Sequence, residues 1–167
     1  YTQFDVVVNP TPVLVIPDPL QECDDATADG LTQFNLTQAN TQIIGANDPA
    51  TVQISYHLTD ADAQAGTPSI SNILSYTNTT PNQQTIYVRV EFIATGCFKV
   101  VPLDLIVNPR PTMPTPESIV LTLCDNDNSG DQQEFFDLTG HIPNIVGTQT
   151  NMLVTFYLTQ ADALAGT

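Results

Sequence analysis

The chain contains an internal repeat with a period of about 100 residues, and this repeat constrains its fold more than any other feature. Residues 56–67 read YHLTDADAQAGT, and residues 156–167 read FYLTQADALAGT, 100 positions later. Self-similarity at a fixed spacing indicates a repeated structural unit, and this period exceeds the roughly 20–50 residues of most solenoid repeats. The repeat therefore predicts separate domains along the chain, each with its own core.

Three further pairs of segments follow the same order and set the boundaries of the modules. They are CDD at 23–25 with CDN at 124–126, FNLT at 34–37 with FDLT at 136–139, and DVVVNP at 5–10 with DLIVNP at 104–109. Their spacings of 101, 102 and 99 positions place small insertions and deletions in loops. We expect the last strand of a preceding module at 1–12, a complete module at 13–111 and the N-terminal half of the next at 112–167. The chain then reads as a segment of a longer array.

The apolar pattern within a module predicts β-strands. Apolar residues occupy every second position at 52–58 and at 86–92, the period of a strand with one buried face. Residues 59–66 begin with a capping box and end in glycine, which predicts one short helical turn. About seven short strands per module, separated by turn residues, predict an all-β fold of tandem immunoglobulin-like β-sandwiches. The proline-rich stretch at 108–116 predicts an extended linker between modules.

The charge balance excludes two classes of partner. The chain has 3 Lys and Arg residues against 18 Asp and Glu residues, a formal net charge of −15. Binding to nucleic acid needs a basic surface that neutralises phosphates, so we expect no nucleic-acid partner. Anionic membrane surfaces repel such a chain, and it contains no apolar run of about 18 residues, so we expect no membrane insertion.

The cysteines at positions 23, 97 and 124 predict a disulfide bond within each module. Cys23 lies near the start of the complete module and Cys97 precedes its last predicted strand, whereas Cys124 would pair beyond residue 167. A bond between Cys23 and Cys97 closes a loop of about 75 residues, worth roughly 4 kcal/mol in the chain-entropy account. It also predicts an oxidising, extracellular compartment. A link between modules and three buried free thiols are the alternatives.

Oxygen-bearing side chains at alternate positions predict a calcium site in the second module. A hard cation needs several oxygen atoms converging from one tight loop, and the first half of an EF-hand-type loop supplies them in this pattern. Gly130 provides the sharp turn, but the twelfth position is Phe136 instead of a bidentate Glu. The candidate ligands are Asp125, Asp127, Ser129 and Asp131.

The equivalent loop of the first module is a weaker candidate for calcium. Asp25 and Asp29 keep the spacing, but Thr27 stands where an acidic residue would be expected. The alternative for both loops is a turn whose carboxylates are solvated.

The sequence contains no recognisable catalytic motif. His57 corresponds to Tyr157 in the repeat, and His141 has no counterpart in the first module, so neither histidine recurs as a repeated catalytic group would. A nucleophile elbow and a phosphate-binding glycine loop are both missing from the sequence. No histidine stands near a cysteine to act as its base. We expect no enzymatic activity.

The combination of short motifs resembles the repeat modules of very large Bacteroidota cell-surface proteins. The motifs are CDD at 23–25, FNLT at 34–37, YHLTDADAQAGT at 56–67, YTNT at 76–79, QTIYVRV at 84–90, TGC at 95–97 and LIVNP at 105–109. Proteins of this kind include gliding-motility adhesins exported by the type IX secretion system. The resemblance spans the chain and implies a secreted protein at the cell surface, on the exterior of the outer membrane.

The repeat and the resemblance together predict a non-enzymatic structural and adhesive module of a long surface fibre. The implied partners are neighbouring modules of the same chain, a surface polysaccharide or substratum, and the secretion and gliding machinery. The alternative is a carbohydrate-binding accessory module of a secreted multidomain protein. Carbohydrate-binding faces generally need exposed aromatic platforms, and the chain has no Trp, which favours the fibre.

Overall fold

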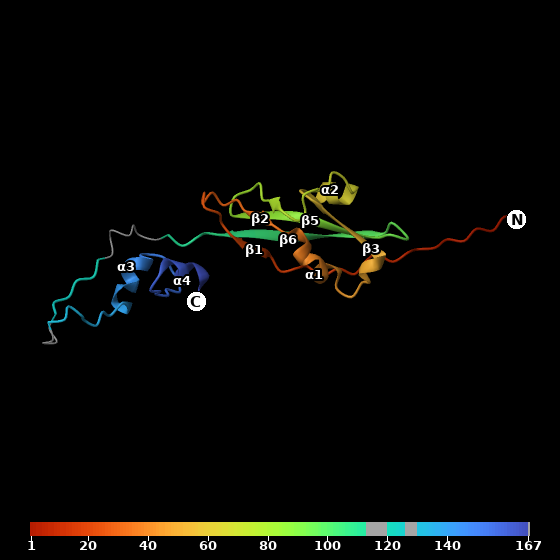
Figure 1. Ribbon diagram of the computed structural model, residues 1–167. Helices are drawn as coiled ribbons and strands as arrows, with labels where there is room; N and C mark the ends of the chain where they lie inside the picture. The colour runs from red at the N-terminus through yellow and green to blue at the C-terminus, as the bar shows by residue number, and fades with distance from the viewer. Residues whose placement is uncertain (113–119, 126–129, 167) are drawn as a thin grey trace. The chain divides into compact units, whose positions relative to one another are not determined.

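The computed structural model describes residues 1–112, 120–125 and 130–166. The chain divides into two compact units, Tyr1–Arg110 and Pro111–Thr167. Both sheets found among the described residues belong to the first unit (Figure 1). Residues 113–116 of the predicted proline-rich linker lie outside the described residues.

The main sheet of the first unit has four strands in the order β1–β6–β5–β3 (Figure 1). Strands β5 and β6 form an antiparallel hairpin, β3 pairs antiparallel with β5, and β1 pairs parallel with the last four residues of β6. The second sheet joins the two short strands β2 and β4. The bounds are β1 (Leu20–Cys23), β2 (Gln33–Phe34), β3 (Val52–His57), β4 (Tyr76–Thr77), β5 (Gln83–Phe92) and β6 (Phe98–Asn108).

One face of the main sheet forms the core of the first unit. Because side chains alternate along a strand, Ile86, Val88 and Val90 of β5 all point to the same face, where they are fully buried. Leu103 and Leu105 of β6 join them. Residues of β2 and of the short helices η1 (Leu36–Ala39) and α1 (Asn40–Ile44) complete the same cluster. The first unit thus has its own continuous core, and we expect it to fold alone.

The predicted short helix is present in both units. Helix α2 (Asp60–Ala65) begins where the Thr59 hydroxyl accepts the Asp62 N–H, and it ends at Gly66 with a φ of 76°. Its equivalent α4 (Gln160–Ala165) has the same cap. The positive φ explains the glycine that follows each copy, because other residues are strained in that conformation.

The structure confirms a β-rich fold with few short helices, and it adds helices that the sequence analysis did not predict. Residues 36–44 form η1 and α1, and a further short helix η2 spans Pro49–Thr51. The Asn35 side chain caps η1 by accepting the Thr37 N–H. The immunoglobulin-like sandwich remains a prediction, since the second sheet has only two short strands.

Three helical elements of the first unit recur in the second. It contains η4 (Thr139–His141), α3 (Ile142–Val146) and α4 in the order of η1, α1 and α2. Apolar side chains such as Leu153 are exposed in this unit.

A buried polar pair of the first unit is replaced by an apolar pair in the sequence of the second. Tyr56 projects from β3 into the core, where its hydroxyl contacts the Leu36 carbonyl oxygen at 3.0 Å and the side-chain oxygen of Asn40. Their equivalents in the second unit are Phe156 and Ile142, so an apolar pair replaces the polar pair.

This exchange predicts a coupled effect on stability in residues 1–111. Tyr56→Phe removes the donor from two acceptors and should lower the free energy of unfolding by about 1–2 kcal/mol. Adding Asn40→Ile should restore part of the loss, because the core then holds the apolar pair. Urea unfolding of the three proteins measures both effects. A double variant no more stable than Tyr56→Phe would refute the coupling.

Burial raises the pKa of Tyr56 to about 12, compared with 10.0 for a free tyrosine, because its ionised form is poorly solvated in the core. The neutral side chain of Tyr56 therefore contributes its full stabilisation to the folded unit below pH 10. Between pH 10 and about pH 12 this contribution is lost progressively, because the tyrosine ionises first in the unfolded state. We expect the free energy of unfolding of residues 1–111 to fall over this window more steeply than that of Tyr56→Phe. Equal slopes in chemical denaturation would show that Tyr56 is not responsible.

Candidate functional site

The two cysteines of the first unit, Cys23 and Cys97, lie at opposite ends of β6. Cys23 ends β1 and pairs with Asn108, the last residue of β6, whereas Cys97 directly precedes Phe98, the first residue of β6. The 11 residues of this strand span roughly 35 Å, while a disulfide needs Cα atoms within about 7 Å. Both thiols are free. The predicted bond between Cys23 and Cys97 is therefore wrong, because the parallel pairing of β1 keeps them apart.

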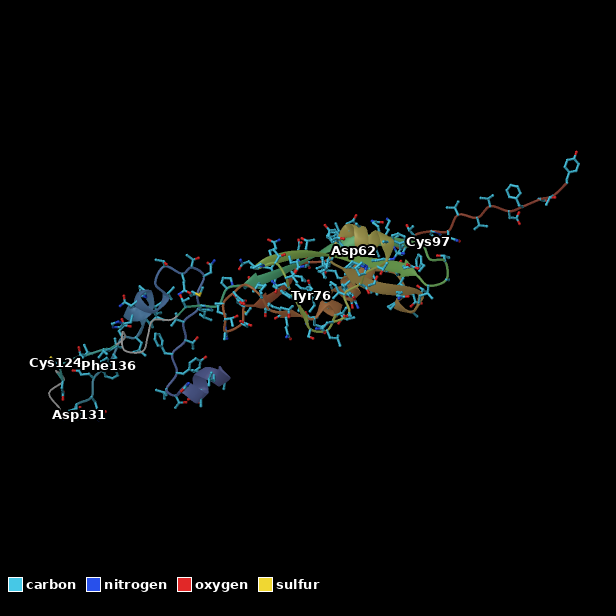
Figure 2. The ribbon with its side chains drawn as sticks, turned by 90° about the horizontal axis from the view of Figure 1, so that it is seen from above. Asp62, Tyr76, Cys97, Cys124, Asp131 and Phe136 are labelled. Atoms are coloured by element: carbon cyan, nitrogen blue, oxygen red, sulfur yellow. The ribbon has the colours of Figure 1, made fainter. Side chains whose placement is uncertain are left out.

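Cys97 lies at the turn between β5 and β6, beside the N-terminal segment. Its carbonyl oxygen accepts the Phe92 N–H at 2.9 Å, which closes the turn. Its Sγ lies 3.9 Å from the carbonyl oxygen of Asn9, a residue 88 positions earlier. Figure 2 shows Cys97 at the end of the unit from which the N-terminal segment extends. The side chain is only partly buried, so it is accessible to a reaction partner.

The exposure of two of the cysteines excludes the alternative of three buried free thiols. Cys23 and Cys124 are both exposed, so three buried free thiols are not what the chain contains.

Asp24 organises the acidic loop that follows Cys23. Its carboxylate is buried and accepts the N–H groups of Asp25 and Gly30, both at 2.9 Å. Gly30 has a φ of 77°, and an added Cβ would lie 2.8 Å from the backbone nitrogen of Asn82. The loop therefore needs glycine at this position and a carboxylate at position 24.

The first loop brings three carboxylates together. One oxygen from each of Asp24, Asp25 and Asp29 lies within 4.8 Å of the others. The predicted ligands Asp25 and Asp29 are thus neighbours, and Asp24 is a third member that the spacing argument did not include. Hydrogen bonds from the hydroxyl and the backbone N–H of Thr27 hold the pKa of Asp25 below its usual value.

The second loop is only partly described. Its predicted ligands Asp127 and Ser129 lie outside the described residues. Asp125, the equivalent of Asp24, accepts the N–H of Gln132 at 2.8 Å, and Asp131 accepts that of Gln133 at 2.9 Å. An aspartate that closes the loop after the cysteine therefore recurs in the repeat.

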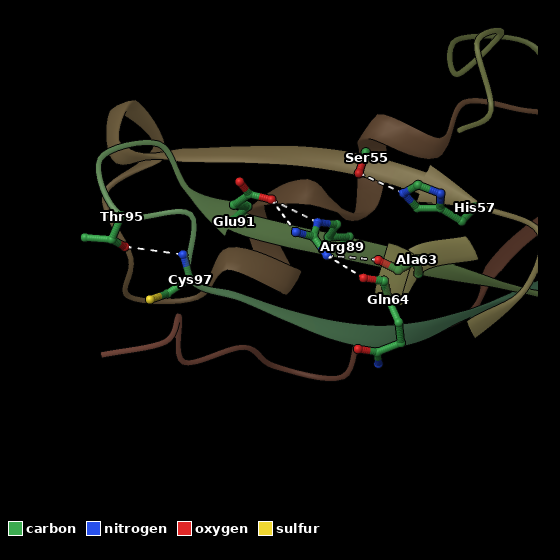
Figure 3. A network of polar contacts seen from close by, with 8 residues as sticks. All are labelled: Ser55, His57, Ala63, Gln64, Arg89, Glu91, Thr95 and Cys97. Atoms are coloured by element: carbon green, nitrogen blue, oxygen red, sulfur yellow. Dashed lines mark hydrogen bonds and ion pairs between the residues drawn. The ribbon is translucent and has the colours of Figure 1, made fainter. Parts of the chain in front are cut away.

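Arg89 fixes helix α2 onto the sheet (Figure 3). Its guanidinium donates to the carbonyl oxygens of Ala63 and Gln64, both at 3.1 Å, and pairs with Glu91 at 2.5 Å. It also stacks 3.3 Å from the centre of the Phe98 ring. These contacts satisfy the C-terminal carbonyls of α2, which indicates a structural role for Arg89.

His57 and Ser55 form a second polar pair in the same view (Figure 3). The ring of His57 is fully buried, with one nitrogen 2.9 Å from the Ser55 hydroxyl and the other 2.7 Å from the Pro68 carbonyl oxygen. A substrate cannot reach this ring, so the pair does not form a nucleophile and base in the folded unit.

The buried position of Asp24 predicts its importance for stability. Asp24→Ala leaves two loop N–H groups without their acceptor and should lower the free energy of unfolding of residues 1–111 by about 2–3 kcal/mol. Asp29→Ala is the matched control, because Asp29 is exposed and, among the described residues, accepts the Leu31 N–H alone, so its loss should cost about 1 kcal/mol or less. Guanidinium unfolding of both variants compares them. Equal losses would contradict the assigned role of Asp24.

A protein-family model described as the Flavobacterium inter-domain disulphide bond domain matches residues 19–111 and 120–167. Among curated proteins and solved structures, no match to the chain was found. No helix in the described part of the chain has the length and apolar character needed to cross a membrane.

Proposed function

The chain belongs to the Flavobacterium inter-domain disulphide bond domain family, and on this basis we propose that it is part of a non-enzymatic array of modules that forms an adhesive cell-surface fibre. One observation carries the proposal: the complete module has a cysteine at each end of its sheet and cannot join them internally. Cysteines placed in this way suit covalent links to neighbouring modules.

The sequence supports a location outside the cell. Disulfide bonds persist in oxidising compartments, which suits a secreted array. The strong negative charge keeps neighbouring chains soluble and apart. The resemblance to gliding-motility adhesins supports export by the type IX secretion system, adhesion to a polysaccharide or substratum, and movement by the gliding machinery.

The alternative function, carbohydrate binding, has one feature in its favour. A groove of about 330 Å³ lies beside α2 and is lined by Leu58, Asp62, Ile70, Asn72 and Tyr76, among others. The ring of Tyr76 is buried and its hydroxyl contacts Gln84 at 3.2 Å, so it offers no stacking platform. The fibre therefore remains the preferred function.

Calcium is proposed as a stiffening ion in the first loop, on the basis of its three convergent carboxylates. We expect calcium to raise the melting temperature of residues 1–111, because a ligand that binds only the folded state stabilises it. Asp25→Asn should abolish the rise, whereas Asp60→Asn, on helix α2, should not. A melting temperature indifferent to calcium and chelator would remove the ion from the proposal.

The location and assembly of the array can be tested directly on cells. Antibodies raised against residues 1–111 should label filaments that extend from the surface of intact cells of the source bacterium in immunogold electron microscopy. Labelling confined to permeabilised cells would refute the proposed function. A glycan-binding screen of the same residues tests the alternative, and saturable binding to one glycan class would favour it.

A further inference from the structure

The family to which the chain belongs is described by inter-domain disulphide bonds, and we propose that in this chain they follow a fixed head-to-tail pattern, in which Cys97 bonds to the preceding module's equivalent of Cys23. By the same rule, Cys23 bonds to the following module's equivalent of Cys97. The inference rests on the proposed array of modules and names the partners of each cysteine within it. Two independent observations converge on it, one from strand register and one from a contact of Cys97.

The register of β1 fixes where the first cysteine of any module lies. Cys23 pairs with Asn108, and the Asp24 N–H donates to the Asn108 carbonyl oxygen at 2.9 Å. The repeat aligns DLIVNP at 104–109 with DVVVNP at 5–10, so Asn9 is the preceding module's equivalent of Asn108. The preceding module's first cysteine is therefore expected on the strand beside Asn9, about 4.8 Å away.

The contact of Cys97 identifies the same place independently. Its Sγ lies 3.9 Å from the Asn9 carbonyl oxygen. In the preceding module, that oxygen is expected to accept the N–H of the residue after the first cysteine, as the Asn108 oxygen does for Asp24. Two cysteines from adjacent modules thus adjoin one carbonyl group, within the range in which a disulfide can form.

The fold disfavours the pairing that sequence proximity alone suggests. Cys97 and Cys124 are separated by only 27 positions across the predicted linker. Cys124 is the equivalent of Cys23, however, so its place is beside the far end of β6 in its own module. Cys97 lies instead at the start of β6, next to the segment that arrives from the preceding module.

Each bond forms by oxidation of two thiols. Two sulfur–hydrogen bonds break, one sulfur–sulfur bond forms, and two protons and two electrons leave. An oxidised dithiol oxidoreductase accepts the electrons by thiol–disulfide exchange and becomes a dithiol. Oxidised glutathione accepts them in vitro and yields two glutathione molecules.

The test uses a tandem chain of residues 1–109 followed by residues 11–111, which joins two complete modules in the natural register. Four variants with Ser at two of the four cysteine positions each retain one pair: the proposed pair (Cys23 of the first copy with Cys97 of the second), the reverse pair, or either intra-copy pair. After oxidation with glutathione in dilute solution, intact mass reports whether the retained thiols have closed without an adduct.

We expect the proposed pair to close and the other three to carry adducts on both thiols. Residues 1–167 contain no proposed pair, so all three of their cysteines should also carry adducts. Closure of an intra-copy pair, of the reverse pair, or of Cys97 with Cys124 would overturn the inference, as would failure of the proposed pair to close. Cell-surface labelling is independent of these results, so it separates failure of this pairing from failure of the proposed function.

Discussion

The antiparallel ladder between β5 and β6 holds the first unit together and determines where its cysteines lie. The two strands stay in register from the pair Gln83 and Ile106 to the pair Glu91 and Phe98, with one face buried in the core. Strand β6 therefore crosses the unit without a break. Strand β1 pairs only with the last four residues of β6, so the outer edge of the first part of β6 has no strand partner among the residues that the structure describes. Pro102 lies in that part, where the lack of an N–H is tolerated.

The proposed bonds would give an array two staggered covalent paths. Each path would run along β6 of one module, through the linker and along β1 of the next, and then cross a disulfide into the module beyond. Each repeat of a path consists of the segment from Cys97 to Cys124, which is 27 positions long, and one disulfide. The remaining segment of each module, between its two cysteines, would connect the paths as a crosslink. Tension would then bypass the folded cores, a useful property in an adhesive fibre.

Sequence patterns predicted the elements that depend on local chemistry. The capping box starting at Thr59 and the glycine at 66 specify helix α2, and the alternation at 86–92 specifies much of β5. The sequence analysis did not foresee the helices at 36–44, whose polar and apolar residues have no clear strand or helix period.

The cysteine pairing could not be obtained from spacing, because it depends on strand direction. The positions of Cys23 near the start of the module and of Cys97 before its last strand suggested that the two thiols lie close together. The parallel pairing of β1 with β6 reverses that expectation and places Cys23 beside Asn108. The role of Asp24 was missed for a related reason, since the ligand spacing drew attention to Asp25 and Asp29. Only the fold shows that Asp24 is the buried acid that closes the loop.

Single-molecule stretching of the oxidised and reduced tandem chain tests the covalent coupling of modules most directly. Reduced, the tandem should show two unfolding steps, each releasing about 90 residues or roughly 300 Å of chain. Oxidised, it should show neither step, because the bond from the first copy to the second encloses both cores. Two full-length steps in the oxidised tandem would contradict coupling altogether. Two shortened steps would indicate that the bonds close within modules or across the linker only.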